Sequence, residues 1–357
     1  MYNLVLVYRM STTCAFNMQL TQIDFSKQQQ HLQKVSRTFA LTIPLLPEAL
    51  VDYISNAYLL CRIADTIEDE PNVPTNQKVA WLNSFSMFCA NEFSDDMQLL
   101  SLHKQAIELV TDGTCLPERE LLNDLEGVIS RTRSFPHKYK MVLARGVSIL
   151  SNGMAKSLQG LKINTLDDVD FYCYYVAGVV GELLAALFYE YDNTIDKYSL
   201  MALSVSFGEG LQLTNILKDR AEDSQRDVSF LPCENGMNAE ETAKYYVKLC
   251  QGHLCDAVDF ICQLPPNEKG IRIFCLLNVV MATSTLKLIS KEDLSGNKKL
   301  KISRNMVKFL YLICRIVAKN NFLVKGFFNL LSCGVTCKRR NAKELRDKVS
   351  CWEKQVY

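Results

Sequence analysis

The sequence spells Asp-x-x-Glu-Asp twice, at residues 65–69 and 219–223, and each copy ends a long stretch with helical periodicity. In the second stretch, Gln212, Asn215 and Asp219 fall on one helical face, and most of the other positions are strongly apolar. Two helices with matched acidic ends constrain the fold more than any other feature, because those ends can face each other across a cavity.

The helix that ends at the first copy has a comparable polar face. Tyr58, Arg62, Asp65 and Asp69 follow each other at spacings of four, three and four residues. Two aspartates one turn apart repel each other by roughly a few tenths of a kcal/mol on a bare helix. Mg²⁺ reverses that sign, because it is held by one or two carboxylates together with substrate phosphates. The two motifs therefore predict a clamp that holds a diphosphate through metal ions.

A solvated helix face is the commoner explanation of any single Asp-x-x-x-Asp pair. The spacing also occurs at Asp192/Asp196 and Asp223/Asp227, where the surrounding residues indicate helix ends or loops. The copies at 65–69 and 219–223 differ from these pairs because they share a glutamate and follow long apolar stretches. Their conjunction, rather than either copy alone, indicates a site.

Strand alternation is hard to find in the 357 residues, and we expect an all-α fold. The net charge of +1 does not favour nucleic acid as a partner. Fourteen cysteines without a Cys-x-x-Cys pattern, and four widely separated histidines, argue against a zinc site and a disulfide scaffold. A reducing cytoplasm is therefore the expected location.

Proline, glycine and capping residues divide the chain into helical segments. We expect a disordered leader over 1–22, a single catalytic domain over 23–335 and a basic C-terminal tail over 336–357. The sequence contains no run of about 18 uncharged apolar residues, so we expect no membrane span. Helices are expected at 23–39, 48–69, 76–93, 97–111, 118–133, 135–160, 167–191, 238–262, 271–289 and 306–335.

Four motifs in order make the chain resemble the squalene/phytoene synthases, the head-to-head trans-prenyl transferases, over about residues 36–309. The motifs are Ser36-Arg37-Thr38-Phe39, Tyr58 with residues 60–69, residues 172–181, and residues 212–223 with Arg226 and Phe230-Leu231-Pro232. The resemblance implies an isoprenoid-synthase-type helical bundle around a central cavity, closest to bacterial squalene and dehydrosqualene synthases.

The resemblance also implies three groups of site residues. Those expected to hold Mg²⁺ are Asp65, Asp69, Asn215, Asp219 and Asp223. Those expected to contact the diphosphates or line the mouth are Ser36, Arg37, Tyr58, Arg62, Gln212, Lys218 and Arg226. Those expected to line the farnesyl pocket are Phe39, Tyr172, Val176 and Ala177, with Tyr172 also a candidate proton relay. Lys218 stands where many relatives have arginine, so it keeps the charge but lacks the bidentate fork.

By this resemblance, one farnesyl diphosphate ionises and the double bond of a second attacks it, so that presqualene diphosphate and then a C30 hydrocarbon form. Squalene, which requires a hydride from NADPH, is the expected product. Dehydrosqualene, presqualene diphosphate and the C20-derived phytoene remain alternatives within the same fold. A non-catalytic helical assembly or partner protein is an alternative of another class, which the two complete acidic motifs disfavour.

Two basic segments suggest further contacts. Lys298, Lys299, Lys301 and Arg304 resemble in position a segment of reducing relatives that could hold NADPH phosphates, although a solvated turn is the commoner reading. The apolar stretch 306–335 is interrupted by basic residues and could rest peripherally on an anionic membrane. A last core helix followed by a solvated tail is the alternative.

Overall fold

The computed structural model describes residues 23–36, 38–160, 162–224, 229–233, 236–291 and 300–354, without the side chains of 222–224. Within these ranges every regular element is helical, which confirms the all-α prediction. The elements are α1 (Phe25–Val35), α2 (Phe39–Thr42), the 3-10 turn η1 (Ile43–Leu45), α3 (Glu48–Asp69), α4 (Thr75–Ala90), α5 (Asp96–Leu109), α6 (Leu116–Asn123), α7 (Leu125–Ser134), α8 (His137–Leu158), α9 (Leu166–Cys173), the π-helix η2 (Tyr174–Gly178), α10 (Val179–Tyr191), α11 (Lys197–Ser224), α12 (Ala239–Gln263), α13 (Lys269–Lys291), α14 (Arg304–Val317), α15 (Asn321–Ser332) and α16 (Ala342–Val349).

The helix that carries the first acidic motif has the predicted bounds. Pro47 precedes α3, and Glu70 ends it in an extended conformation. Two predicted helices are each divided in the structure. Residues 118–133 form α6 and α7, which meet at Asp124. Residues 306–335 form α14 and α15, and the side chain of Asn320 starts the second by accepting hydrogen bonds from the amides of Phe322 and Leu323.

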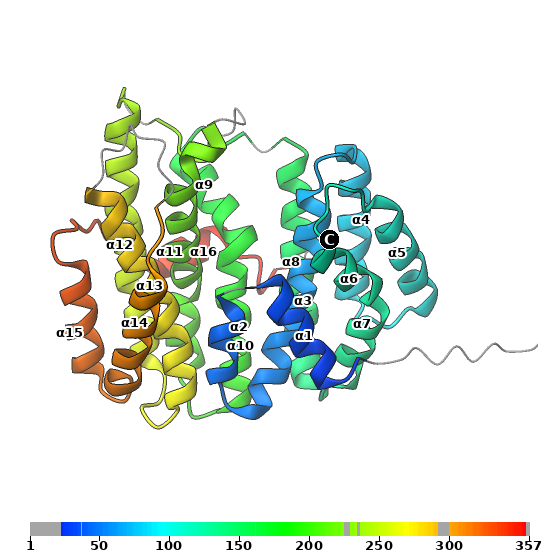
Figure 1. The fold of residues 1–357 in the computed structure, drawn as a ribbon, viewed down its shortest axis with the longest axis horizontal. Coiled ribbons are helices and arrows are strands. Elements are labelled where there is room, and N and C mark those ends of the chain that lie inside the picture. The colour runs from blue at the N-terminus through cyan, green and yellow to red at the C-terminus, as the bar shows by residue number, and fades with distance from the viewer. Residues whose placement is uncertain are drawn as a thin grey trace, which may run out of the picture.

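The long helices form a bundle whose middle is built from α3, α8, α10 and α11 (Figure 1). Helices α4 to α7 gather at one end of the molecule, and α12 to α15 gather at the other. Helix α11 packs against α10, α12, α13 and α16, and α8 packs against α3, α4 and α10. The two motif-bearing helices, α3 and α11, therefore belong to the same central bundle.

Two apolar stretches, Leu166–Tyr191 and Lys269–Lys291, are long enough to cross a membrane by length and composition alone. They correspond to α9–η2–α10 and to α13. In each, most of the apolar window is buried inside the protein, 67% and 78% respectively. The core of the bundle thus accounts for their composition.

The C-terminal segment does not form the free tail that the sequence suggested. Over 342–349 it folds into α16, which packs against α11 and α9. Arg340 and Arg346, which we expected to be solvated, form ion pairs with Asp170 and Glu182 of the core helices. The prediction fails here because the partners of these arginines lie more than 160 residues away in sequence.

Candidate active site

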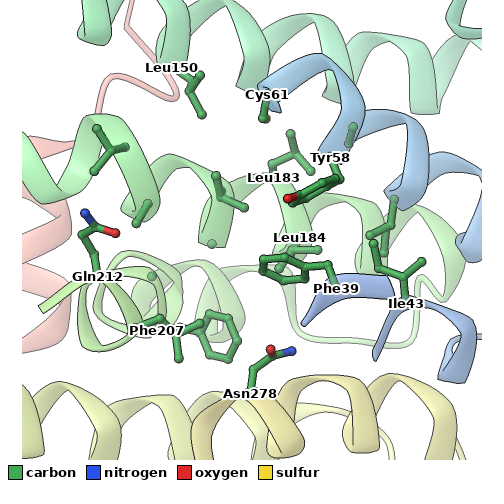
Figure 2. A pocket seen from close by; sticks show the side chains of 18 of the residues that line it. Phe39, Ile43, Tyr58, Cys61, Leu150, Leu183, Leu184, Phe207, Gln212 and Asn278 are labelled. Carbon is green, nitrogen blue, oxygen red and sulfur yellow. The ribbon is translucent and has the colours of Figure 1, made fainter. Parts of the chain in front are cut away.

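A cavity of about 220 Å³ lies in the middle of the bundle, between the two motif-bearing helices. Its walls come from α2, η1, α3, α8, η2, α10, α11 and α13. Figure 2 shows its mostly apolar lining, with the rings of Phe39 and Tyr58 close together and Gln212 at another side. The apolar lining residues are Phe39, Ile43, Ile54, Ala57, Leu150, Val176, Ala177, Val180, Leu183, Leu184, Phe207, Leu211 and Phe274.

Both motif-bearing helices contribute polar side chains to this cavity, but only the first acidic motif does so through a carboxylate, since neither Asp69 nor Asp219 is among the lining residues. Asp65 of α3 lines it, as do Gln212 and Asn215 of α11. The carboxylate and the two amides are the residues that the helical spacing placed on the polar faces. The fold therefore brings Asp65 of α3 and the two amides of α11 to a single cavity, and the metal clamp between the two motifs stays a prediction.

The carboxyl group of Asp65 is strongly desolvated. About 37% of its side-chain surface is accessible, and the residue lines the cavity. Desolvation by the surrounding protein raises the pKa of Asp65 to about 6, although Arg62 opposes the shift. A cation placed beside this carboxylate would replace the solvation that burial removes.

Arg62 joins the predicted site to an acid that the sequence did not single out. Its guanidinium donates to Asp65 at 3.4 Å and to Glu118 of α6 at 2.6 Å. Glu118 is largely shielded, with 19% of its side chain exposed. The two carboxylates hold Arg62 beside the acidic end of α3. Glu118 was missed because its position depends on a contact between helices 56 residues apart.

On α11, the predicted cation and ligands lie next to each other. The Lys218 ammonium is 3.1 Å from Asn215 Oδ1 and 3.1 Å from Asp219. About one third of the Asp219 side chain is exposed. An amide oxygen, a carboxylate and an ammonium group are thus clustered on one turn of α11, near the edge of the cavity that Asn215 lines.

The predicted motif at residues 36–39 and Tyr58 together supply an aromatic wall of the cavity. The Ser36 hydroxyl accepts a hydrogen bond at 3.0 Å from the amide of Phe39, the first residue of α2. The Phe39 and Tyr58 rings lie 5.1 Å apart between centroids, and both line the cavity. Tyr58 donates to the Val35 carbonyl at 3.4 Å, and burial raises the pKa of its hydroxyl. Both aromatic faces are therefore held at the cavity by local contacts.

The glycine-rich stretch on the opposite wall combines two roles that the sequence left open. A Cβ atom on Gly208 would lie 2.2 Å from the Ala177 carbonyl oxygen, and one on Gly181 would lie 2.0 Å from the Ser204 carbonyl oxygen. Glycine is thus required for the close approach of α11 to η2 and α10. Ala177, Gly181 and Gly208 also line the cavity, so the close packing shapes the hollow itself.

Tyr172 is an exception among the residues predicted to line the farnesyl pocket. It is not one of the residues that line the cavity, whereas Val176 and Ala177 are. Its ring stacks on that of Phe230 at a centroid distance of 4.7 Å, and this joins the motif in α9 to the end of the motif that follows α11. Among the other predicted site residues, Arg37, the Asp223 side chain and Arg226 lie outside the described part of the chain.

Several lining residues could not be inferred from the motifs. Asn278 of α13 reaches the cavity from the side opposite Tyr58 (Figure 2), and its amide donates to the Phe274 carbonyl at 2.8 Å. A single asparagine within a strongly apolar helix was the available signal. The apolar walls from α8, α10 and α13 gave no such signal, because cavity-lining and core side chains have the same composition.

The donor set of the predicted magnesium site fits a hard cation. Within the described residues, no group of three or more His, Cys, Asp or Glu side chains could hold a metal ion by itself. Mg²⁺ does not need such a group, since it is commonly held by one or two carboxylates with substrate phosphates and water. The desolvated carboxylate of Asp65 and the oxygens of Asn215 and Asp219 are hard donors of this kind.

Comparison with known proteins gives a consistent result. The sequence model of the squalene/phytoene synthase family matches residues 32–306. The squalene synthase of Eremothecium gossypii is 28% identical over 311 residues, which cover 80% of this chain and 67% of the relative. That of Saccharomyces cerevisiae is 29% identical over 299 residues, which cover 76% of this chain and 63% of the relative. That of Solanum lycopersicum is 31% identical over 278 residues, which cover 72% of this chain and 62% of the relative.

Solved structures show the same architecture. A structure of TcSQS with the ligand BPH1237 has a TM-score of 0.71 at 23% identity, and the match covers 92% of this chain and 98% of that one. A dehydrosqualene synthase in complex with a ligand has a TM-score of 0.57 at 20% identity, and the match covers 83% of this chain and 96% of that one. This chain spans about two thirds or less of the length of the curated relatives it matches.

Proposed function

The chain belongs to the squalene/phytoene synthase family, and on that premise we propose that it condenses two farnesyl diphosphates head to head, through presqualene diphosphate, to squalene. One observation carries the proposal. Asp65 of α3, and Gln212 and Asn215 of α11, line one largely apolar cavity although they lie far apart in sequence. A diphosphate held at the acidic edge would place its hydrocarbon chain in that cavity.

The polar edge of the cavity matches the needs of a diphosphate leaving group. Asp65, Asp69, Asn215 and Asp219 would hold Mg²⁺, with Asp223 as a further ligand. When bound, Mg²⁺ would neutralise the charge that develops on the departing diphosphate. Lys218 lies 3.1 Å from both Asn215 and Asp219, which places a positive charge where diphosphate oxygens would meet α11. Arg62 provides the corresponding charge beside Asp65 on α3.

The remainder of the cavity suits an allylic cation. Its apolar walls would exclude water, which would otherwise capture the cation as an alcohol. The adjoining faces of Phe39 and Tyr58 can stabilise a desolvated cation by up to about 2 kcal/mol. Tyr172 stays a candidate for the proton relay; its ring lies on Phe230, so that role requires the hydroxyl rather than the ring face to reach the site.

The proposed last step is a reduction. The relatives at 28–31% identity are squalene synthases by name. Squalene formation requires a hydride, and NADPH is the donor that we propose. Lys301 and Arg304 are exposed, as a site for cofactor phosphates requires, whereas Lys298 and Lys299 lie outside the described residues. Without hydride transfer the same cation would lose a proton and give dehydrosqualene.

Product analysis tests this function. The protein is incubated with Mg²⁺ and labelled farnesyl or geranylgeranyl diphosphate, with and without NADPH, and the products are identified by chromatography and mass spectrometry. We expect squalene only when NADPH is present. Dehydrosqualene in both reactions, accumulation of presqualene diphosphate, or phytoene from geranylgeranyl diphosphate would each assign a different member of the family. No turnover of either substrate would support the assembly-protein alternative.

We also propose that the protein rests on an anionic membrane through the outer face of α14 and α15. Seven of the sixteen exposed large hydrophobic side chains among the described residues fall within this short hairpin. They are Met306, Phe309, Leu312, Ile316, Phe322, Leu323 and Leu330. Scattered exposed apolar residues are normal, but a concentration of this kind marks an interaction surface.

The charges around this face favour a lipid partner. Residues 300–343 contain no aspartate or glutamate. On α14, an exposed stripe of Phe309, Leu312 and Ile316 runs beside exposed basic residues at 304, 308, 315 and 319. Each Lys or Arg near an anionic surface adds about 1 kcal/mol of attraction. Arg339 and Arg340, by contrast, are bound to acids within the protein, so within the basic C-terminal region we assign the membrane contact to α14–α15.

Vesicle flotation tests the membrane contact. The wild-type protein should float with vesicles that contain phosphatidylserine, and less with pure phosphatidylcholine. Leu312→Asp/Ile316→Asp should remain at the bottom of the gradient. Met97→Asp, which changes an exposed apolar residue of α5 at the other end of the bundle, is the matched control and should float. Equal flotation of all three proteins would exclude this face as the contact.

A further inference from the structure

Residues 337–352, here called the C-terminal strap, cross the outside of the helices whose inner side lines the cavity. The strap backbone lies so close to α12 that a Cβ atom on Gly252 would be 2.2 Å from the Lys338 carbonyl oxygen. The Lys338 amide donates to the Lys248 carbonyl at 2.8 Å. At its other end, Arg145 of α8 donates to the Trp352 carbonyl at 2.8 Å. The strap is therefore anchored at both ends to the body of the protein.

Between these anchors, the strap supplies the positive partners of two buried acids. Arg340 donates to both oxygens of Asp170 in α9, at 2.7 and 2.6 Å. Arg346 donates to Glu182 of α10 at 2.8 Å. Asp170 and Glu182 are almost entirely buried, with 2% and 0% of their surfaces exposed. A buried carboxylate needs a partner of opposite charge, so these helices depend on the strap for theirs.

The same contacts hold the π-helix. Tyr174, the first residue of η2, is fully buried and donates to Glu182 at 2.9 Å. The Tyr174 hydroxyl in turn accepts a hydrogen bond from the Cys351 amide at 2.7 Å. Ser350 completes the cluster by donating to Glu182 at 2.7 Å. One turn of π-helix costs regular hydrogen bonding, and here the strap fixes its first residue from outside.

The inner side of this helical stretch lines the cavity. Val176, Ala177, Val180 and Leu183 contribute to the wall, while Asp170, Tyr174 and Glu182 contact the strap. A displacement of the stretch would therefore change the shape of the cavity. The predicted magnesium ligands lie on other helices, α3 and the later turns of α11, whereas the strap meets α11 near its start, where Lys343 lies over the Tyr198 ring.

We propose that the C-terminal strap positions the α9–η2–α10 wall of the active site, with Arg346 and Arg340 as positioning residues for the reaction. This inference rests on the proposed function for its catalytic readout. The ion pairs of the strap act on the wall that would hold the reacting carbons, and none of the predicted magnesium ligands is a partner in them. Loss of its contacts should consequently slow the reaction of bound substrate and leave substrate binding largely intact.

The test uses the full chain and variants in which both members of a buried ion pair are replaced together. In Glu182→Gln/Arg346→Met and Asp170→Asn/Arg340→Met, both members of an ion pair become neutral, which guards against simple failure to fold. Arg346→Lys is the conservative variant, and Lys354→Met, at an exposed side chain just beyond the strap, is the control. Steady-state turnover of farnesyl diphosphate and hydrogen exchange of backbone amides are measured for each protein.

We expect kcat to fall about tenfold or more in the two paired variants, because a displacement of about 1 Å in a catalytic wall can cost up to about a hundredfold. The KM should change less than about threefold, since the diphosphate ligands are elsewhere. Amide exchange should rise in residues 174–184 and not in α3. Arg346→Lys should recover part of kcat, and Lys354→Met should match the wild type.

Unchanged kcat and unchanged exchange at 174–184 in both paired variants would overturn the inference. An even rise of exchange over the whole chain would also overturn it, because it would mean that the strap adds only global stability. If the wild-type protein turns over no prenyl diphosphate, the proposed function fails. The exchange pattern would then still decide whether the strap holds this wall.

Discussion

The close packing of α11 on the π-helix makes Gly208→Ala an informative perturbation. The new methyl group would lie 2.2 Å from the Ala177 carbonyl oxygen and 2.9 Å from the Gly178 Cα. Ordinary contact begins near 3.4 Å, so α11 and η2 must separate by about 1.2 Å at this point. Backbone atoms cannot rotate out of the way as a side chain does. The strain must therefore move one of the two helices.

The expected losses of unfolding free energy and of kcat follow from overpacking and from the position of the contact. Overpacking in a core costs about 1–3 kcal/mol of unfolding free energy. Alanine in a helix interior recovers up to about 1 kcal/mol relative to glycine. Gly208 and Ala177 both line the cavity, so the displacement falls at the site itself and should lower kcat by up to about a hundredfold. We expect a moderate loss of stability and a larger proportional loss of activity.

Gly326→Ala in α15 is the matched control. It is the same substitution within a helix, but a Cβ atom there meets no other atom within 4 Å. Urea denaturation and turnover of farnesyl diphosphate are measured for both variants. Gly326→Ala should be as active as the wild type and no less stable. The reasoning is refuted if Gly208→Ala matches Gly326→Ala in both measurements.

Three further predictions concern buried charge, pH and metal. Arg272 is fully buried and donates to the carbonyls of Ala318, Ile261 and Leu264 and to Asn321. Arg272→Met leaves these acceptors unpaired, and we expect it to lower the unfolding free energy by about 3 kcal/mol or more in urea titrations. Burial, helped by the charge of a nearby arginine, lowers the pKa of His253 to about 3. The His253 imidazole becomes protonated below about pH 6.5 in the unfolded chain, whereas in the folded protein it stays neutral. At pH 5.5 the free energy of unfolding of the wild type should therefore be about 1.4 kcal/mol lower through this residue, and His253→Gln should lack that part of the loss. Chelation of divalent cations should abolish turnover, and added MgCl₂ should restore it, with little change in Tm.

The sequence predicted the parts of the fold that depend on local signals. Pro47 and the Glu70-Pro71 pair mark the ends of α3, and the acidic motif could be placed on its last turn. The juxtaposition of Asp65 with Gln212 and Asn215 was also predicted, because helices with complementary polar faces have few ways to share a cavity.

The sequence could not predict the contacts that link distant segments. Arg340 and Arg346 look like solvated tail residues until Asp170 and Glu182 appear beside them. Glu118 looks like a surface acid until Arg62 meets it. The π-helical turn at 174–178 was missed because a one-residue insertion in a helix leaves the apolar composition unchanged.

The most direct test of the central claim is the turnover of labelled farnesyl diphosphate by Asp65→Asn and Asp219→Asn, with Asp112→Asn as an exposed control of the same type. If the two helices clamp the diphosphate through Mg²⁺, each of the first two variants should lose at least about a hundredfold in kcat while circular dichroism and Tm stay close to the wild type. The control should retain full activity. Near-normal turnover by either Asp65→Asn or Asp219→Asn in a folded protein would contradict the account.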